Sequence, residues 1–102
     1  ISLTTVMPEL INLCETKSPI ILLVKPQFEA TKKEASKTNG IISDPNIWFR
    51  TLQEVTNSAK EAGGYIQAAT TSPILGRSGN KEFFLLFETE TSENKVDFST
   101  LF

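Results

Sequence analysis

The sequence predicts an α/β fold in which helices alternate with strands and the last two strands form an antiparallel hairpin. A continuous apolar run at 19–24 is typical of a strand covered on both faces, as in a parallel sheet. Two further runs of strand-forming residues, at 65–71 and 82–88, are separated by a turn-rich connection and are expected to pair as a hairpin. With 102 residues and 39% hydrophobic content, the chain forms one domain at most.

A helix is expected before the first strand. Thr5 is a candidate N-cap, and Pro8 is expected in the first turn, where no N–H is needed. The apolar residues at helical spacing, assigned to its buried face, are Val6, Leu10, Leu13 and Cys14.

The segment 29–43 is rich in Lys, Glu, Ser and Thr and contains the pair Asn39-Gly40, so it is expected to be a long polar loop. Loops of this length in compact domains are usually functional or mobile. Two interpretations remain open, a lid over a site and a solvated connection.

A second helix is expected to begin at Asp44 as N-cap, with Pro45 at its first position, and to end at the pair Gly63-Gly64. Its repeat of apolar residues is interpreted as core packing, and consists of Trp48, Leu52, Val55, Ala59 and Ala62.

Lys25 ends the first predicted strand and is followed by Pro26, which biases it towards an extended backbone. Because ligands of open parallel sheets gather at the carboxyl ends of their strands, Lys25 is the first catalytic candidate. A solvated lysine capping a strand is the alternative. Glu82 is the second candidate, because a carboxylate at the entry of an apolar strand needs a partner, for example one of opposite charge.

Composition excludes several classes of function. The chain has no His and one Cys, which excludes the usual zinc spacings, every His-based triad and an intrachain disulfide, and favours a reducing, cytoplasmic setting. No apolar run is long enough for a membrane span. A net charge of −2 is unlike the basic excess of autonomous RNA binders, so any RNA contact must be local. The local basic residues are Lys25, Lys32, Lys33, Lys37, Arg77 and Lys81.

Four motifs resemble one family in order and spacing. They are Lys25-Pro26-Gln27-Phe28-Glu29-Ala30, Gly40-Ile41-Ile42-Ser43-Asp44-Pro45, Ser72-Pro73-Ile74-Leu75-Gly76 and Gly79-Asn80-Lys81-Glu82-Phe83. The family is that of the TlyA-type (haemolysin A) relatives of the FtsJ-like RNA ribose 2′-O-methyltransferases. The resemblance covers residues 1–88 and implies the carboxyl-terminal half of a Rossmann-like methyltransferase domain. Residues 89–102 are expected to be a polar tail of unknown order.

The resemblance also implies roles for single residues. FtsJ-like enzymes use a Lys-Asp-Lys-Glu tetrad, in which Lys25 matches the second lysine and Glu82 the glutamate. The other two members, and the contacts to the cofactor S-adenosylmethionine, would lie upstream of Ile1, so the chain alone is expected to be inactive. The residues expected to bind the RNA substrate are Gln27, Phe28, Ser72, Asn80, Lys32, Lys33 and Arg77.

The expected partner is RNA, with ribosomal RNA or ribosomal subunits favoured and no metal implied. A non-catalytic RNA- or ribosome-binding domain with the same fold is the alternative, since relatives are also called haemolysins. For Asn80 and Gly79, plain turn chemistry is as good an interpretation as a direct role.

Overall fold

The structure is a computed structural model that describes residues 2–14, 18–90 and 93–102. Ile1, which opens the segment matched to the family, lies outside the described residues. So do residues 91–92 of the expected tail.

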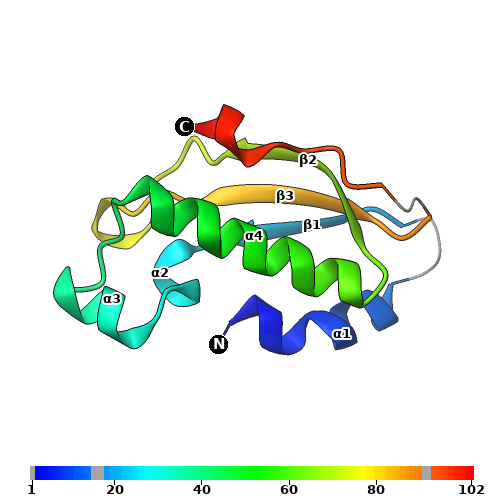
Figure 1. Ribbon diagram of the computed structural model, residues 1–102, viewed down its shortest axis with the longest axis horizontal. Helices are drawn as coiled ribbons and strands as arrows, with labels where there is room; N and C mark the ends of the chain where they lie inside the picture. Colours follow the sequence, from blue (N-terminus) through cyan, green and yellow to red (C-terminus); the bar gives the residue numbers. More distant parts are fainter. Residues whose placement is uncertain (1, 15–17, 91–92) are drawn as a thin grey trace.

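A three-stranded antiparallel sheet forms one layer of the molecule (Figure 1). Its strands are β1 (Ile20–Val24), β2 (Tyr65–Thr71) and β3 (Phe83–Glu88). β3 lies in the middle and is antiparallel to both neighbours, so β1 and β2 point in the same direction. The predicted α/β class and the hairpin of β2 and β3 are confirmed.

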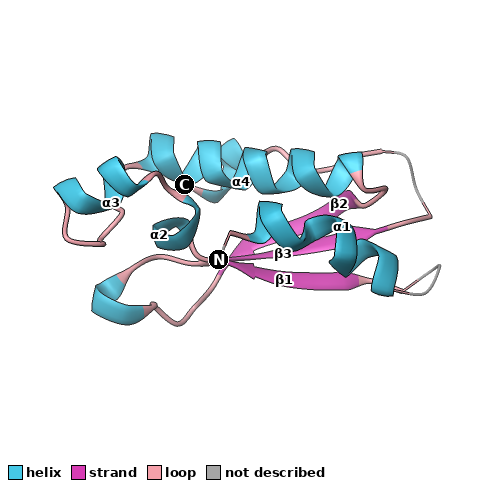
Figure 2. Ribbon diagram, turned by 90° about the horizontal axis from the view of Figure 1, so that it is seen from below, coloured by secondary structure: helices cyan, strands magenta, loops and turns pink. Residues whose placement is uncertain are grey.

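The prediction that the first strand is covered on both faces is wrong for this chain. Ile20 and Val24 are buried, whereas Ile21 between them is 67% exposed. The helices α1 (Leu3–Leu13) and α4 (Pro45–Glu61) lie on the same face of the sheet (Figure 2). The parallel neighbour is also absent among the described strands, where β1 pairs antiparallel with β3. An apolar run indicates that a strand can be buried, but it does not specify which part of the protein covers each of its faces.

The first helix was predicted with the wrong cap and the wrong buried face. Ser2 is the N-cap, its side chain accepting a hydrogen bond from the Thr4 N–H, and Pro8 lies inside the helix beyond its first turn. Met7 and Ile11 are its buried residues, whereas Leu13 is 82% exposed. The predicted face lies about one residue out of phase with the face that packs on the sheet. Cys14 is the half-buried C-cap.

The segment 29–43, expected to be a long polar loop, contains the helix α3 (Lys32–Lys37) instead. It is preceded by α2 (Pro26–Glu29), which Lys25 joins to β1. α3 starts with a capping box, in which Thr31 and Glu34 accept hydrogen bonds from each other's backbone N–H groups. The helix was not predicted because it packs no side chain into the core, and its sequence therefore has no repeat of apolar residues.

The second predicted helix is confirmed as α4, with Asp44 as its N-cap and Pro45 in its first turn. Its predicted apolar repeat faces the core: Leu52, Val55 and Ala59 are fully buried, and Trp48 packs against them as a half-buried residue. The chain leaves α4 through Gly63, whose φ of 98° is a conformation that favours glycine.

The hydrophobic core lies between α1, α4 and the sheet, and the expected tail contributes to it through Phe98 in the 3₁₀ turn η2 (Phe98–Leu101). Phe102 contacts the rings of Trp48 and Phe83, with centroids 5.7 and 5.8 Å away. The buried core residues are Met7, Ile11, Ile20, Val24, Leu52, Val55, Ala59, Ile66, Phe83, Leu85, Phe87 and Phe98.

Candidate active site

Lys25 lies where β1 passes into α2. Its backbone is extended, with φ −111° and ψ 99°, as the following proline predicts, and it serves as the N-cap of α2. Its side chain is half-buried, and its Nζ atom lies 5.7 Å from the centre of the Phe28 ring. Pro26 is buried and fixes the turn from strand to helix. The lysine is therefore carried by a rigid junction at the end of the sheet.

Glu82 immediately precedes β3 and is only 7% exposed. Its carboxylate accepts a hydrogen bond of 3.0 Å from the side-chain amide of Gln27. No ion pair joins Glu82 to a basic residue in the described part of the chain, so the partner supplied by this structure is an amide and not the expected opposite charge. Gln27 thus connects the turn that carries Lys25 with the second catalytic candidate.

The turn after β2 is closely fitted to Glu82. The Ser72 N–H donates to the Glu82 carbonyl at 2.8 Å, and the Ser72 hydroxyl accepts from the Ile74 N–H at 3.2 Å. At Gly76 a Cβ atom would lie 2.1 Å from the Glu82 carboxylate, so a side chain there requires the carboxylate or the turn to move. This turn forms one wall around the carboxylate.

Asn80 holds two loops together. Its side-chain oxygen accepts from the Ile42 N–H at 2.9 Å, and its amide nitrogen donates to the Gly40 and Arg77 carbonyls at 2.9 and 3.2 Å. The side chain is buried and uses both its acceptor and its two donor hydrogens in these contacts. Of the two interpretations of Asn80, the structure supports a structural role in the turn. Its side chain joins the 40–42 segment to the 77–80 turn.

A pocket of about 240 Å³ opens between these loops. Four residues expected at the substrate site line it, namely Gln27, Phe28, Arg77 and Asn80, together with Asn39, Gly40 and Ser78, which sequence reasoning missed. Phe28 is 61% exposed, so part of this residue is accessible at the pocket. Asn39 and Ser78 have positive φ values of 54° and 62°, conformations uncommon for residues other than glycine.

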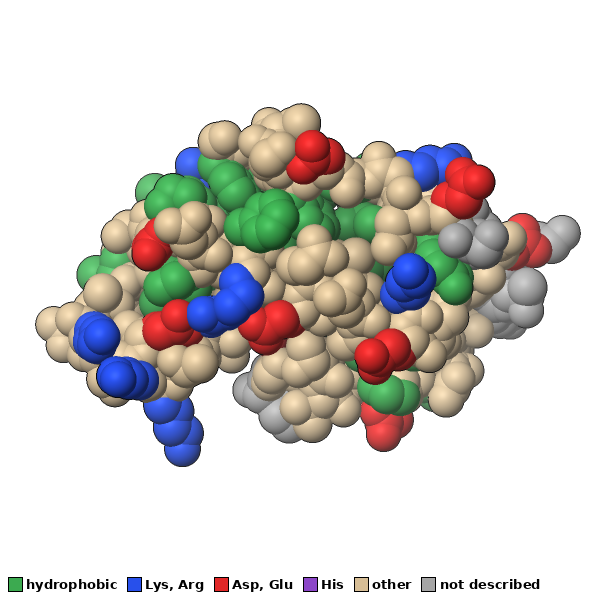
Figure 3. Space-filling model, in the orientation of Figure 1, with side chains coloured by type: hydrophobic (Ala, Val, Ile, Leu, Met, Phe, Trp, Pro, Cys, Tyr) green, Lys and Arg blue, Asp and Glu red, His purple; other side chains and the backbone are tan. Residues whose placement is uncertain are grey.

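The other expected basic contacts lie outside this pocket lining. Lys32 and Lys33 are exposed on α3, and Lys37 ends the same helix. Lys81 lies next to Glu82 in sequence, but its Nζ atom is 5.1 Å from the centre of the Trp48 ring. Lysine and arginine side chains gather over α3 at the lower left of the molecular surface (Figure 3).

A second carboxylate fixes α2 against the start of α1. Glu29 accepts a hydrogen bond of 2.8 Å from the Leu3 N–H and another from the Ser2 hydroxyl. A carboxylate at the amino end of a helix is stabilised by the unpaired N–H groups there. The role of Glu29 was not predicted, because the contact joins residues far apart in the sequence.

The described helices include none that is long and apolar enough to cross a membrane. Across the same residues, no group of three or more His, Cys, Asp or Glu side chains is arranged to hold a metal ion.

Comparison with known proteins identifies relatives, although no family model matches the chain. The chain is 38% identical over 91 residues to the 16S/23S rRNA (cytidine-2′-O)-methyltransferase TlyA of Mycobacterium tuberculosis, a match that covers 89% of this chain and 34% of that protein. It is 36% identical over 85 residues to YqxC of Bacillus subtilis, provisionally named an rRNA methyltransferase, with 83% and 30% covered. Hemolysin A of Brachyspira hyodysenteriae is 32% identical over 85% of this chain and 36% of its own length.

Solved structures agree with these sequence matches. A protein of Lactococcus lactis, provisionally described as a hemolysin, superposes with a TM-score of 0.90 at 34% identity and covers 99% of this chain and 49% of its own. Another from Streptococcus thermophilus, described in the same way, gives a TM-score of 0.84 at 35% identity, with 94% and 34% covered.

The sequence matches place the chain among proteins that are named either rRNA methyltransferases or hemolysins. More narrowly, it belongs to the TlyA-type (haemolysin A) family, as the four motifs predict. The chain spans about a third of the length of the curated relatives it matches.

Proposed function

We propose that the intact protein is an S-adenosylmethionine-dependent RNA ribose 2′-O-methyltransferase that acts on ribosomal RNA in the cytoplasm. The observation that carries the proposal is the contact between Gln27 and Glu82, which links the turn of Lys25 to Glu82. The two residues that match the family's tetrad thus lie on neighbouring segments, which this hydrogen bond links at the end of the sheet. The names of the relatives supply the reaction class and the class of substrate.

Lys25 would carry the proton chemistry. A ribose hydroxyl is a poor nucleophile, and it must lose its proton as its oxygen bonds to the incoming methyl group. In the proposed step the 2′-hydroxyl proton passes to the Lys25 amine. Glu82 would orient the lysine and the ribose, while Gln27 holds the Glu82 carboxylate in place.

The substrate nucleotide would occupy the pocket beside this cluster. The exposed ring of Phe28 can stack on a base, as aromatic side chains do in many RNA complexes. Arg77 at the other wall can pair with a phosphate, and Ser72 and Asn80 shape the turn that forms the wall. Lys32, Lys33 and Lys37 on α3, with Lys81, would contact phosphates further along the RNA.

S-adenosylmethionine would supply the methyl group, but the residues that the structure describes form no glycine loop of the kind that binds it. Cofactor loops of doubly wound folds place glycines between a strand and the following helix. In the described chain β1 passes into α2 through Lys25-Pro26, and the pair Gly63-Gly64 leads from a helix into a strand. We therefore assign the cofactor contacts to parts of the protein outside this sequence, and expect the 102-residue chain alone to be inactive.

The test is methyl transfer by the full-length protein. Purified protein, labelled S-adenosylmethionine and ribosomal subunits from a strain lacking the gene should yield label in ribosomal RNA, on a ribose 2′-oxygen mapped by resistance to alkaline hydrolysis. Label on a base, or no label in RNA that the protein binds, would reject the proposed reaction.

A binding domain without catalysis is the alternative, favoured by one observation. The described part of the chain shows no ion pair between Lys25 and Glu82, although the family's tetrad implies that they act together. Tight binding to ribosomal subunits without methyl transfer by the full-length protein would establish this alternative.

A further inference from the structure

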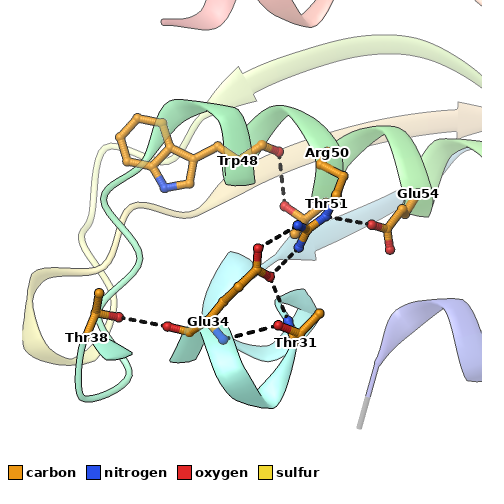
Figure 4. Close-up of polar contacts among 7 residues, drawn as sticks. All are labelled: Thr31, Glu34, Thr38, Trp48, Arg50, Thr51 and Glu54. Carbon is orange, nitrogen blue, oxygen red and sulfur yellow. Dashed lines mark hydrogen bonds and ion pairs between the residues drawn. The ribbon is translucent and has the colours of Figure 1, made fainter. Parts of the chain in front are cut away.

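α3 is attached to the rest of the molecule by an ion pair with two hydrogen bonds. The Arg50 guanidinium on α4 donates to both oxygens of Glu34 on α3, at 2.6 Å and 2.5 Å (Figure 4). A third Arg50 nitrogen donates to Glu54 on its own helix at 2.9 Å. Parallel contacts between a guanidinium and a carboxylate fix orientation as well as distance, so the pair restrains α3 more than a single contact would.

α3 depends on this attachment because it has little else to hold it. The helix has six residues and no buried side chain. Isolated helices shorter than about 12 residues are marginal in water. The capping box between Thr31 and Glu34 favours the helical conformation, but it does not fix where the helix lies.

The same pair determines the charge that α3 presents. Lys32, Lys33 and Lys37 are exposed, whereas the carboxylate of Glu34 is turned towards Arg50 (Figure 4). The only acidic residue of the helix is thus neutralised locally, and the lysines face outward without it. The hydrogen bond from Arg50 is the largest of several causes that lower the pKa of Glu34 to about 2, so the carboxylate is ionised throughout the neutral range.

We propose that Arg50 is a positioning residue that, through Glu34, holds α3 as a fixed basic surface for RNA phosphates. This inference rests on the proposed function. The segment is then a preformed contact surface, which differs from both a lid and a solvated loop. Without the pair, α3 must be ordered each time RNA binds, and the cost of ordering appears as weaker binding.

Two variants of the full-length protein separate positioning from charge. Arg50→Ala removes the pair and one positive charge, and Lys60→Ala is its control, because Lys60 is an exposed residue of the same helix about 15 Å further along. Glu34→Gln keeps a side chain that can complete the capping box but removes a negative charge. If only charge matters, Glu34→Gln should tighten RNA binding because a negative charge is lost. If the ion pair positions α3, the same substitution should weaken binding.

Binding is measured with purified ribosomal RNA, and the order of α3 by amide exchange at Ala35 and Gly40, whose N–H groups bond within this segment. We expect Arg50→Ala to weaken binding about tenfold, well beyond Lys60→Ala, and Glu34→Gln to weaken it as well. In both variants the α3 amides should exchange faster, and methyl transfer at saturating RNA should remain near normal.

Two results would overturn the inference: Glu34→Gln binding RNA as tightly as the unmodified protein, or unchanged α3 exchange in Arg50→Ala. Failure of the proposed function has a different signature. In that case the unmodified protein would neither bind nor methylate ribosomal RNA, and the exchange comparison would still decide whether Arg50 holds α3.

Discussion

The side-chain amide of Gln27 donates a hydrogen bond of 3.0 Å to the carboxylate of Glu82, across 55 positions of the sequence. The contact joins the first turn after β1 to the first residue before β3. Because β1 and β3 are paired antiparallel, Val24 and Phe83 are direct neighbours, and the residues that follow one and precede the other meet at the same end of the sheet. The sheet itself therefore brings the candidate site together.

Gln27→Leu should destabilise the protein and lower methyl transfer. The buried Glu82 carboxylate would lose the amide that solvates it, at a cost of about 1–3 kcal/mol in the free energy of unfolding. Gln53→Leu is the control, since Gln53 makes an amide contact with Asn57 on the exposed surface of α4. Urea unfolding of both variants measures the difference. Equal losses in the free energy of unfolding would show that the Gln27 contact stabilises the protein no more than the exposed contact of Gln53.

Gly76→Ala should damage the site through a clash. The added methyl group would lie 2.1 Å from the present position of the Glu82 carboxylate, so the turn or the carboxylate must move. We expect a loss of about 1–3 kcal/mol in stability, typical of overpacking, with methyl transfer reduced further than stability alone explains. Ile74→Ala in the same turn is the control, because Ile74 is 76% exposed. Normal activity of Gly76→Ala would show that Glu82 need not stay where it is.

The attachment of α3 should weaken in acid. The pKa of Glu34 falls from its ordinary 4.5 to about 2, chiefly through the hydrogen bond from Arg50 and next through the Thr31 N–H. Since the folded value is the lower one, the stabilisation is fully present above pH 4.5 and is lost as the pH falls towards 2. The difference in α3 amide protection between the unmodified protein and Arg50→Ala should therefore shrink over this range. A difference that stays constant down to pH 2 would contradict the assignment of the ion pair.

RNA binding should depend on salt through the basic residues around the pocket. If Lys32, Lys33 and Arg77 each contact a phosphate, neutralising one should lower the slope of log affinity against log salt by about one unit. Lys60→Gln on α4 is the control and should leave the slope unchanged. An unaltered slope in a variant with Lys32, Lys33 and Arg77 all neutralised would place the RNA on another surface.

The strands and α4 were predictable because local patterns specify them. Asp44-Pro45 marks a helix start by its own chemistry, and the hairpin follows from two apolar runs joined by a turn. The catalytic roles of Lys25 and Glu82 stay predictions, which rest on their places at the end of one strand and the start of another and on the family's tetrad.

Other features could not be predicted because they depend on tertiary contacts. The burial of Met7 instead of Leu13 depends on how α1 packs against the rest of the core, which the local sequence does not specify. Nothing local to Glu29 indicates that it caps a helix 26 positions earlier in the chain. Thr31 and Glu34 have the spacing of a capping box, which indicates the start of α3. The long polar run around them favoured a loop instead.

The central claim is that Lys25 carries the proton step of RNA ribose methylation, and methyl transfer by Lys25→Ala in the full-length protein tests it most directly. We expect this variant to lose detectable transfer to ribosomal subunits while its affinity for S-adenosylmethionine stays near normal. Lys25→Arg should not restore activity, because a guanidinium remains charged and cannot accept the proton. Near-normal turnover by Lys25→Ala would contradict the account and favour a domain that binds RNA without modifying it.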